Sequence, residues 1–346
     1  MNVVVAALAA GVMIGGCARG AAGNAGETQP AATTSTTSTA LPASGTSTAA
    51  AASPGDVVRR IPLPGAFVAT TGFGAVWVTS PATHTVVKVS AAGIPVGRVV
   101  LAAAATETGT EAFVTTDKDS VWASDTAAGT VVRIDPRTLK VRAVVKVGDA
   151  PWGLDAGKDA VWVALHHGRA HGALARIESA TNKVTTRIPL GAPTQGPGHV
   201  AVDGDDVWVG VDSDKTVVRV SARTYQVLAT VPVPGGSCGG LDAIAGAAWV
   251  GSRICGSKVS RIDARSNAIT AMREEPGLIL GLAGDADSVW VVDKSGPGSS
   301  ALLRLDPTTL EAVGSLELDT GAAGVTKGLG SVWVTGGDEL IQIAPR

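Results

Sequence analysis

The sequence predicts an all-β fold, a seven-bladed β-propeller of four-stranded antiparallel blades. Two observations carry this prediction: a tryptophan phrase that recurs at a regular interval, and a four-strand pattern inside each repeat. The phrase reads AVWV or a close variant and holds seven of the eight tryptophans: Trp77, Trp122, Trp162, Trp208, Trp249, Trp290 and Trp333. Successive intervals are 45, 40, 46, 41, 41 and 43 residues. A strand-only repeat of this size is typical of a propeller blade.

Each repeat divides into four short β-rich runs separated by turn residues. In the second repeat the runs cover 111–116, 121–124, 131–135 and 140–148. None of them is long enough for an ordinary helix, and Gly, Pro, Asp and Ser fill the connections between them. We call the four strands A to D in chain order, with the tryptophan on strand B.

A basic residue recurs in the middle of strand C in six repeats, as Lys88, Arg133, Arg176, Arg219, Arg261 and Arg304. A ring of anion-binding arginines is one interpretation. We favour a structural one, because alternate residues of an outer strand face solvent and a long basic side chain covers apolar surface while its charged end stays wet. The tryptophans are expected to fill the wedge between neighbouring blades.

The two ends of the repeats complement each other. The segment 56–63 belongs to no repeat, whereas the last repeat has strands A, B and C but no D. We expect the early strand to pair beside the last one, with Val58 close to Ile343, because this closes the ring and removes two exposed sheet edges. The propeller is therefore predicted to cover residues 55–346.

The first residues look like a lipoprotein signal. The apolar run at 3–16 is too short to span a bilayer as a mature helix. It ends in Ile14-Gly15-Gly16-Cys17, which has the form of a bacterial lipobox. We predict a signal peptide over 1–16 and a lipid on Cys17 that anchors the protein to the extracytoplasmic face of the cell membrane. Met1 and Asn2 lack the usual positive charge, so either the start codon is placed late or the signal is weak. The alternatives are a plain secretory signal with an incidental Cys and an ordinary buried segment.

Residues 17–54 begin with the lipidated Cys and consist almost wholly of Ala, Thr, Ser, Gly and Pro. Such a segment cannot bury enough apolar surface to offset the entropy of ordering, so we predict a disordered tether. A flexible coil of this length reaches roughly 35 Å, which separates the propeller from the membrane.

The net charge of −2 gives no basic field to hold a phosphate backbone, so a nucleic acid is not expected as a partner. The expected partners are the membrane, through the lipid, and an unidentified protein, glycan or small molecule. We expect a monomer.

Two cysteines remain after Cys17, and an exported protein keeps its disulfides. If the turn in the fifth repeat is Gly246-Ala247, a two-residue hairpin places Cys238 and Cys255 opposite each other, within disulfide reach. Such a disulfide contributes about 3 kcal/mol in the chain-entropy description. A catalytic cysteine is the less favoured alternative, since that repeat contains no histidine.

A ligand is expected at the end of the central channel where the D–A and B–C connections meet, which we call the channel face. The position ten residues before each tryptophan varies between repeats, as a recognition position would. The candidate ligand-binding residues there are Phe67, Trp152 and Leu280, together with Glu111 at the start of the second A strand.

Four of the five histidines fall on the same face: His166, His167, His171 and His199. Imidazole is a common ligand of zinc and copper, so these residues are the candidates for a divalent metal. We favour a solvated loop and no cofactor, because the spacing matches no recognised zinc pattern and the loop has no Asp or Glu.

The blade motifs resemble those of the bacterial YVTN/YncE-like and virginiamycin B lyase-like propellers. The resemblance rests on VWV, on VxRIDPxT and on the phrase APWGLDAG at 150–157, and it covers 56–346. It implies the propeller fold but no single function, because this fold carries unrelated activities.

The lyase branch implies a His general base with a Glu and a magnesium ion in the last blades. Here the last histidine is His199, and Glu274 and Glu275 have no histidine nearby in the sequence. The lyase residues therefore have no counterparts. We favour a non-catalytic binding or scaffolding module that acts through its channel face. The alternative is a divergent propeller enzyme, a C–O lyase or lactonase, with a metal at the histidine-bearing face.

Overall fold

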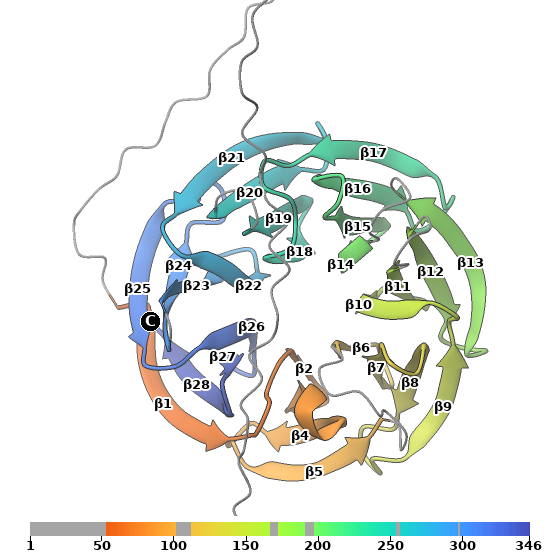
Figure 1. Cartoon of the computed structure of the whole chain (residues 1–346), viewed down its shortest axis with the longest axis horizontal. Coiled ribbons are helices and arrows are strands. Elements are labelled where there is room, and N and C mark those ends of the chain that lie inside the picture. The colour runs from red at the N-terminus through yellow and green to blue at the C-terminus, as the bar shows by residue number, and fades with distance from the viewer. Residues whose placement is uncertain (1–52, 102–111, 167–171, 191–196, 254–256, 297) are drawn as a thin grey trace, which may run out of the picture. The chain divides into compact units, whose positions relative to one another are not determined.

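A computed structural model gives the structure of the protein, and Figure 1 shows the whole chain. It describes residues 53–101, 112–166, 172–190, 197–253, 257–296 and 298–346. These residues belong to one compact unit, Ala51–Arg346. The predicted signal peptide at 1–16, Cys17 and the tether up to residue 52 lie outside the described residues, so they stay predictions.

The described residues form seven four-stranded antiparallel sheets arranged around a ring, which confirms the predicted seven-bladed propeller. Blade 1 comprises β2 (Ala69–Gly72), β3 (Ala75–Ser80), β4 (Thr85–Ser90) and β5 (Pro95–Val100). Blade 2 comprises β6 (Val114–Thr116), β7 (Val121–Asp125), β8 (Thr130–Ile134) and β9 (Val141–Lys146). Blade 3 comprises β10 (Ala150–Ala156), β11 (Ala160–His166), β12 (Gly172–Glu178) and β13 (Lys183–Leu190). Blade 4 comprises β14 (Pro197–Asp203), β15 (Asp206–Val211), β16 (Thr216–Ser221) and β17 (Val227–Pro232).

The remaining blades follow the same plan. Blade 5 comprises β18 (Gly240–Ile244), β19 (Ala247–Ser252), β20 (Ser257–Asp263) and β21 (Ala268–Glu275). Blade 6 comprises β22 (Leu278–Gly284), β23 (Val289–Gly296), β24 (Ser299–Leu305) and β25 (Ala312–Leu318). Blade 7 comprises β26 (Ala322–Gly328), β27 (Ser331–Gly336) and β28 (Glu339–Pro345), and its fourth strand is β1 (Gly55–Pro62). A short 3-10 turn, η1 (Pro81–Thr83), connects β3 to β4.

The ring closes where the two ends of the propeller meet. Strand β1 pairs with β28 in antiparallel register, with Val57 opposite Ile343 and Ile61 opposite Leu340. In Figure 1 the orange β1 lies beside the blue β28. The predicted closure is therefore confirmed, and the edge of β28 that faces away from β27 is paired with β1.

The tryptophan of each strand B fills the wedge between its own blade and the next. All seven side chains are at most 2% exposed to solvent. Trp77 shares a buried cluster with Val114 and Val121 of blade 2, and Trp333 shares one with Val76 of blade 1. The core is thus a ring of seven interfaces between blades, as the regular spacing predicts.

The basic residues of strand C are structural, and four of the six also bond to the following blade, which was not expected. Lys88, Arg133, Arg219 and Arg304 lie over the tryptophan of their own blade, with 5.0 to 5.7 Å from the cation to the ring centroid. Each also donates a hydrogen bond to a main-chain oxygen of the following blade. Such a side chain links blades, which the surface interpretation did not foresee.

The hairpin of blade 5 has a different register from the one predicted. Leu241 pairs with Val250 and Ile244 with Ala247, so the turn is Ala245-Gly246 instead of Gly246-Ala247. Gly246 adopts a positive φ of 77° and Ala245 one of 54°, which a tight two-residue hairpin requires. β18 begins at Gly240, and Gly239 already donates to the carbonyl of Gly251, so this register does not continue to Cys238.

The predicted disulfide geometry is therefore wrong in its register. Cys238 is a half-buried thiol that hydrogen bonds with Arg253. Cys255 lies outside the described residues, so the Cys238–Cys255 bond itself stays a prediction. In the described part of the chain, no helix has the length and apolar character needed to cross a membrane.

Candidate functional site

Five rings from four neighbouring blades form one cluster at the channel face. The channel-face cluster consists of Phe67, Phe113, Trp152, His166 and His199. Phe113 lies at its centre, with ring centroids 5.8 Å from Phe67, 6.4 Å from Trp152 and 5.9 Å from His199. The rings of Trp152 and His166 are 4.9 Å apart.

The contacts within the cluster are of the kind that aromatic rings prefer. Phe113 meets Phe67 and His199 edge to face, with interplanar angles of 74° and 83°. Such arrangements place the positive edge of one ring against the negative face of another. The cluster is therefore a packed platform that spans blades 1 to 4.

The inner strands carry local irregularities at the cluster. The pairing of β10 with β11 shifts between Pro151 and Leu154, at Trp152, and that of β14 with β15 shifts between Pro197 and Val200, at His199. A β-bulge re-aims the side chain of the extra residue. The bulges thus explain why these two side chains meet rings of neighbouring blades instead of following the alternation of a regular strand.

The backbone under the cluster is held by one hydrogen bond between blades, by one within blade 2 and by one close approach. Thr335 Oγ1 of blade 7 donates to the carbonyl of Phe67 at 2.5 Å, and Ser124 Oγ accepts from the Phe113 N–H at 2.9 Å. A Cβ on Gly153 would lie 2.4 Å from the carbonyl oxygen of Gly198. Only glycine at this position lets blades 3 and 4 come together behind Trp152.

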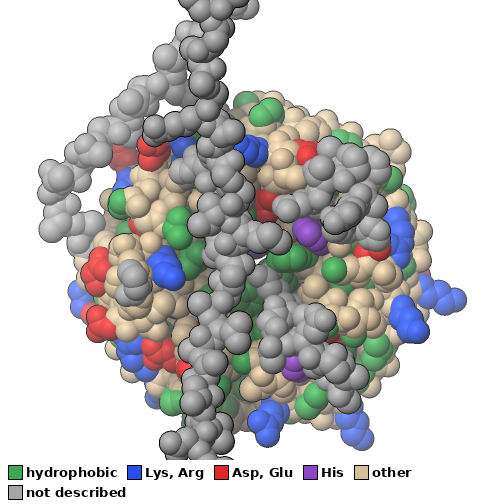
Figure 2. Space-filling model, in the orientation of Figure 1, with side chains coloured by type: hydrophobic (Ala, Val, Ile, Leu, Met, Phe, Trp, Pro, Cys, Tyr) green, Lys and Arg blue, Asp and Glu red, His purple; other side chains and the backbone are tan. Residues whose placement is uncertain are grey.

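Four rings of the cluster are partly exposed. Phe67, Trp152, His166 and His199 are half-buried, whereas Phe113 is 8% exposed. Figure 2 shows hydrophobic and histidine side chains on one face of the ring. A partly exposed aromatic platform at a channel mouth can bind a flat apolar group without rearranging the core.

The cluster contains part of the residue set predicted from the sequence. Phe67, Trp152, His166 and His199 belong to it, but Leu280 does not: it lies in β22 and packs against the core between blades 6 and 7. Glu111, His167 and His171 lie outside the described residues. The sequence reasoning missed Phe113, although it stands nine residues before its blade tryptophan, as His199 does.

His199 is set apart by its electrostatic surroundings. Burial lowers the pKa of its imidazole, and Arg253 lowers it further, while Asp212 and a hydrogen bond to the carbonyl of Cys238 act in the opposite direction. The imidazole is therefore neutral around pH 7. Asp212 is itself held by Ser237, whose N–H and hydroxyl donate to it at 3.0 and 2.5 Å.

The thiol of Cys238 lies beside these groups. Burial raises its pKa, and the negative charge of Asp212 raises it further, more than Arg253 compensates. A thiol reacts as its thiolate, so this environment works against a nucleophilic cysteine.

The predicted metal site has only two of its residues among the described ones. His166 contacts Trp152, and His199 contacts Phe113. Within the described ranges, no three side chains of His, Cys, Asp or Glu are grouped as a metal site would require. The metal alternative thus depends on His167 and His171, and it stays a prediction.

Two carboxylates line the inner strands below the cluster. Asp155 accepts hydrogen bonds from Thr115 of blade 2 at 2.9 Å and from the N–H of Val202 of blade 4 at 2.9 Å. Asp242 accepts from the N–H of Gly284 of blade 6 at 2.7 Å. Both therefore link blades around the channel, and burial raises the pKa of each, that of Asp242 to about 7.

No protein-family model and no curated protein matches the sequence. Solved structures match the fold. Virginiamycin B lyase from Staphylococcus aureus superimposes with a TM-score of 0.67 at 17% identity, covering 83% of this chain and 99% of the lyase. A streptogramin B lyase gives 0.67 at 14% identity, covering 83% and 95%. The WD40 repeats of RRP9 give 0.70 at 13% identity, covering 86% and 99%.

At these identities the likeness concerns the fold alone. The resemblance to the virginiamycin B lyase-like propellers is thus confirmed for the architecture. The YncE-like and lipoprotein assignments stay predictions.

The Asp242→Asn variant tests the buried carboxylate. The folded pKa of about 7 lies above the unfolded value of 3.8, so the stability that this group contributes is complete below pH 3.8 and is lost as the pH rises through 7. The free energy of unfolding of the wild type should therefore fall more steeply than that of Asp242→Asn between about pH 4 and pH 7. Urea unfolding at several pH values measures both slopes. Parallel curves would show that Asp242 ionises normally.

Proposed function

We propose that the protein is a non-catalytic binding module of the extracytoplasmic membrane face, which holds its ligand at the channel-face cluster. The observation that carries this proposal is the platform of half-buried rings around Trp152, contributed by four blades at one end of the channel. A site assembled from several blades is fixed by the whole ring, so it needs little reorganisation to bind.

The chemistry of the platform favours a flat, largely uncharged ligand group, such as a sugar or an aromatic ring. Trp152, Phe67 and Phe113 offer ring faces and edges, and the neutral His199 offers no net charge. Stacking on such rings gives affinity, and the imidazole nitrogens give polar recognition.

The membrane anchor is supported by the sequence alone. The lipobox-like Ile14-Gly15-Gly16-Cys17 follows a short apolar run, and a tether of Ala, Thr, Ser, Gly and Pro precedes the propeller. This order places a folded binding domain at the end of a flexible stalk.

The second candidate is a divergent propeller lyase or lactonase. Its support is that the matching structures include two lyases of this fold and that the ring cluster contains His166 and His199. It requires a divalent metal at the histidine-bearing face.

A ligand screen tests the binding function. Soluble oligosaccharides and small aromatic compounds are assayed by thermal shift, and each hit is titrated while tryptophan fluorescence is followed. Trp152→Ala should weaken binding of a hit at least tenfold, because a buried aromatic contact is worth about 1–3 kcal/mol. Phe73→Leu, a change of an exposed ring in the β2–β3 turn, serves as the control and should leave binding unchanged.

Two results would count against the binding proposal. One is a set of hits that bind wild type and Trp152→Ala equally well. The other is stoichiometric divalent metal in the purified protein that is lost in a variant with His167→Ala and His199→Ala, because that outcome supports the enzyme.

The Cys17→Ala variant tests the anchor. Lipidation needs the cysteine sulfur, so the wild type should incorporate labelled palmitate and sediment with membranes, whereas the variant should do neither. Equal membrane fractions for both proteins would refute the anchor and leave the channel-face proposal untouched.

A further inference from the structure

One hydrogen bond links blade to blade around almost the whole ring. A side chain from strand B or C of one blade donates to a main-chain oxygen just past strand C of the next, which we call the turn oxygen. Six of the seven interfaces contain this bond in the described residues. The pairs, donor first, are Lys88 with Pro136, Arg133 with Ser179, Arg219 with Ala264, Trp249 with Pro307, Arg304 with Arg346, and Gln342 with Ala91.

The interface between blades 3 and 4 is different. Its turn oxygen belongs to Ala222, and no hydrogen bond reaches this oxygen from any described residue. Arg176, which occupies the donor position, instead donates to Thr185 Oγ1 of its own blade at 2.9 Å. Arg261 of blade 5 makes the same kind of bond to Thr270, but there Trp249 supplies the link to the next blade. Its guanidinium lies 5.8 Å from the ring centroid of Tyr225 and does not lie over Trp162.

A difference in the C–D turn of blade 4 accompanies the missing link. At two other interfaces the arginine has a second acceptor, the side-chain oxygen of Asn182 for Arg133 and that of Asn267 for Arg219, each at 2.9 Å. Asn182, Tyr225 and Asn267 all have a positive φ between 54° and 61° in the same C–D turn. Blade 4 has Tyr225 in place of the asparagine, so the arginine loses an acceptor and meets a ring.

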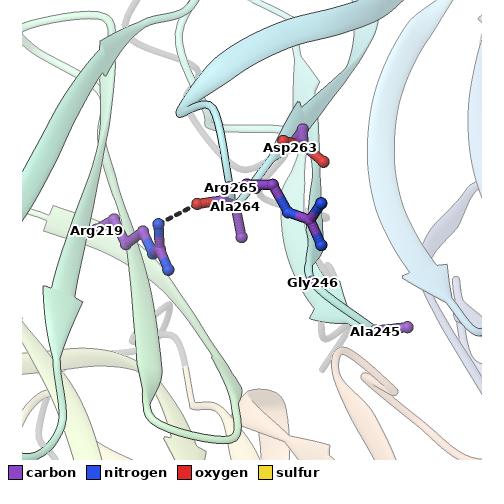
Figure 3. Close-up of a pocket in the computed structure, with 6 residues that line it drawn as sticks. All are labelled: Arg219, Ala245, Gly246, Asp263, Ala264 and Arg265. Carbon is purple, nitrogen blue, oxygen red and sulfur yellow. Dashed lines mark hydrogen bonds between the residues drawn. The ribbon is translucent and has the colours of Figure 1, made fainter.

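A cavity lies at this unlinked interface. Its volume is about 470 Å³, and its walls include Gly157, Lys158, Trp162, Arg176 and Ala222. The corresponding cavity between blades 4 and 5 is smaller, about 340 Å³. Figure 3 shows the hydrogen bond from Arg219 to Ala264 on its wall.

The wall of the larger cavity contains an indole donor without an acceptor. Trp162 is 2% exposed, and its indole nitrogen lies 3.6 Å from where a Cβ of Gly157 would be. In five other blades the indole N–H donates to an oxygen of the protein. For Trp162, as for Trp208, no acceptor is present among the described residues, so the Trp162 N–H can donate to a molecule in the cavity.

The charges at the cavity favour an anion. Lys158, Arg176 and Arg223 line it against Asp159 and Asp205, which leaves one net positive charge. The pair Arg223–Asp205 is 3.6 Å apart and mostly exposed, so solvent weakens it. Arg176 is the less exposed cation beside the unpaired indole.

We propose that this cavity binds the carboxylate of a small organic acid. The two carboxylate oxygens take the place of the turn oxygen and the asparagine oxygen that satisfy the arginine elsewhere, because a guanidinium matches a carboxylate with two parallel hydrogen bonds. The Trp162 N–H is a further donor, and the ring of Tyr225 packs on the flat body of the acid. The site adjoins the β10–β11 turn, at the opposite end of β10 from Trp152, so it is independent of the channel-face cluster.

Benzoate is the probe, and benzamide is its neutral control of the same shape. Isothermal titration should give a Kd of about 1 mM or lower for benzoate, and a loss of at least tenfold with benzamide. Arg176→Met should weaken benzoate binding at least tenfold, since a charge-assisted hydrogen bond is lost. Arg219→Met, at the linked interface, should bind benzoate like the wild type.

Tyr225→Asn supplies a test that does not depend on loss of function. This change restores the second acceptor, so Arg176 should turn to Ala222 and fill the cavity. Benzoate binding should then fall, and the midpoint of thermal unfolding should rise by about 2 °C. Equal binding of benzoate and benzamide to the wild type, or unchanged benzoate binding in Arg176→Met, overturns the proposal.

Discussion

Each blade presents one face of its sheet to the next, and the large side chain that fills the gap is the tryptophan of strand B. A four-stranded sheet of this size has too little core to be stable alone, so the blades depend on being packed in sequence around the ring. A buried tryptophan packs in each of these interfaces, and at six of them a hydrogen bond to the turn oxygen links one blade to the next. The first and last blades are packed on both sides only when the ring is closed. The pairing of β1 with β28 closes it. The placement of every candidate site follows from that closed geometry.

The two faces of the ring present different side chains, because bulges lie at one end of the inner strands and charged turns at the other. At the channel face, bulges at the start of the inner strands turn Trp152 and His199 toward neighbouring blades, and a mostly uncharged platform results. At the other end, the A–B and C–D turns bring charged residues to the blade interfaces, and the exception between blades 3 and 4 leaves Arg176 without its usual acceptor. Between the two ends, Asp155 and Asp242 link inner strands across the channel wall.

Much of the fold could be predicted from the sequence. A tryptophan buried at the same site of every blade imposes a regular spacing on the sequence, even where the other residues vary. The closure could also be predicted, because the segment 56–63 belongs to no repeat and the last repeat lacks one strand. The hairpin of blade 5 was placed one residue too late, since Ala245-Gly246 and Gly246-Ala247 look equally suited to a two-residue turn until both positive φ angles are seen. The bulges at the channel face carry no local sequence signal of their own. Phe113 was missed because it stands nine residues before its tryptophan instead of ten, and Leu280 lies at a similar bulge but outside the ring cluster.

The structural role of the strand C cations could be predicted only in outline. Sequence spacing indicates that Arg133 and Arg219 share a position in their strands, but the acceptors lie in the next blade, more than forty residues away. Such contacts depend on how two blades pack. The asparagine that completes them, and its replacement by Tyr225, acquire meaning only once the interfaces are compared around the ring.

The closure of the ring is tested most directly by hydrogen exchange of the main-chain amides of β1, followed by mass spectrometry on the native protein. If β1 completes blade 7, its amides are protected as strongly as those of β28 and exchange only when the whole propeller unfolds. Rapid exchange of β1 while β28 stays protected would contradict the closed ring.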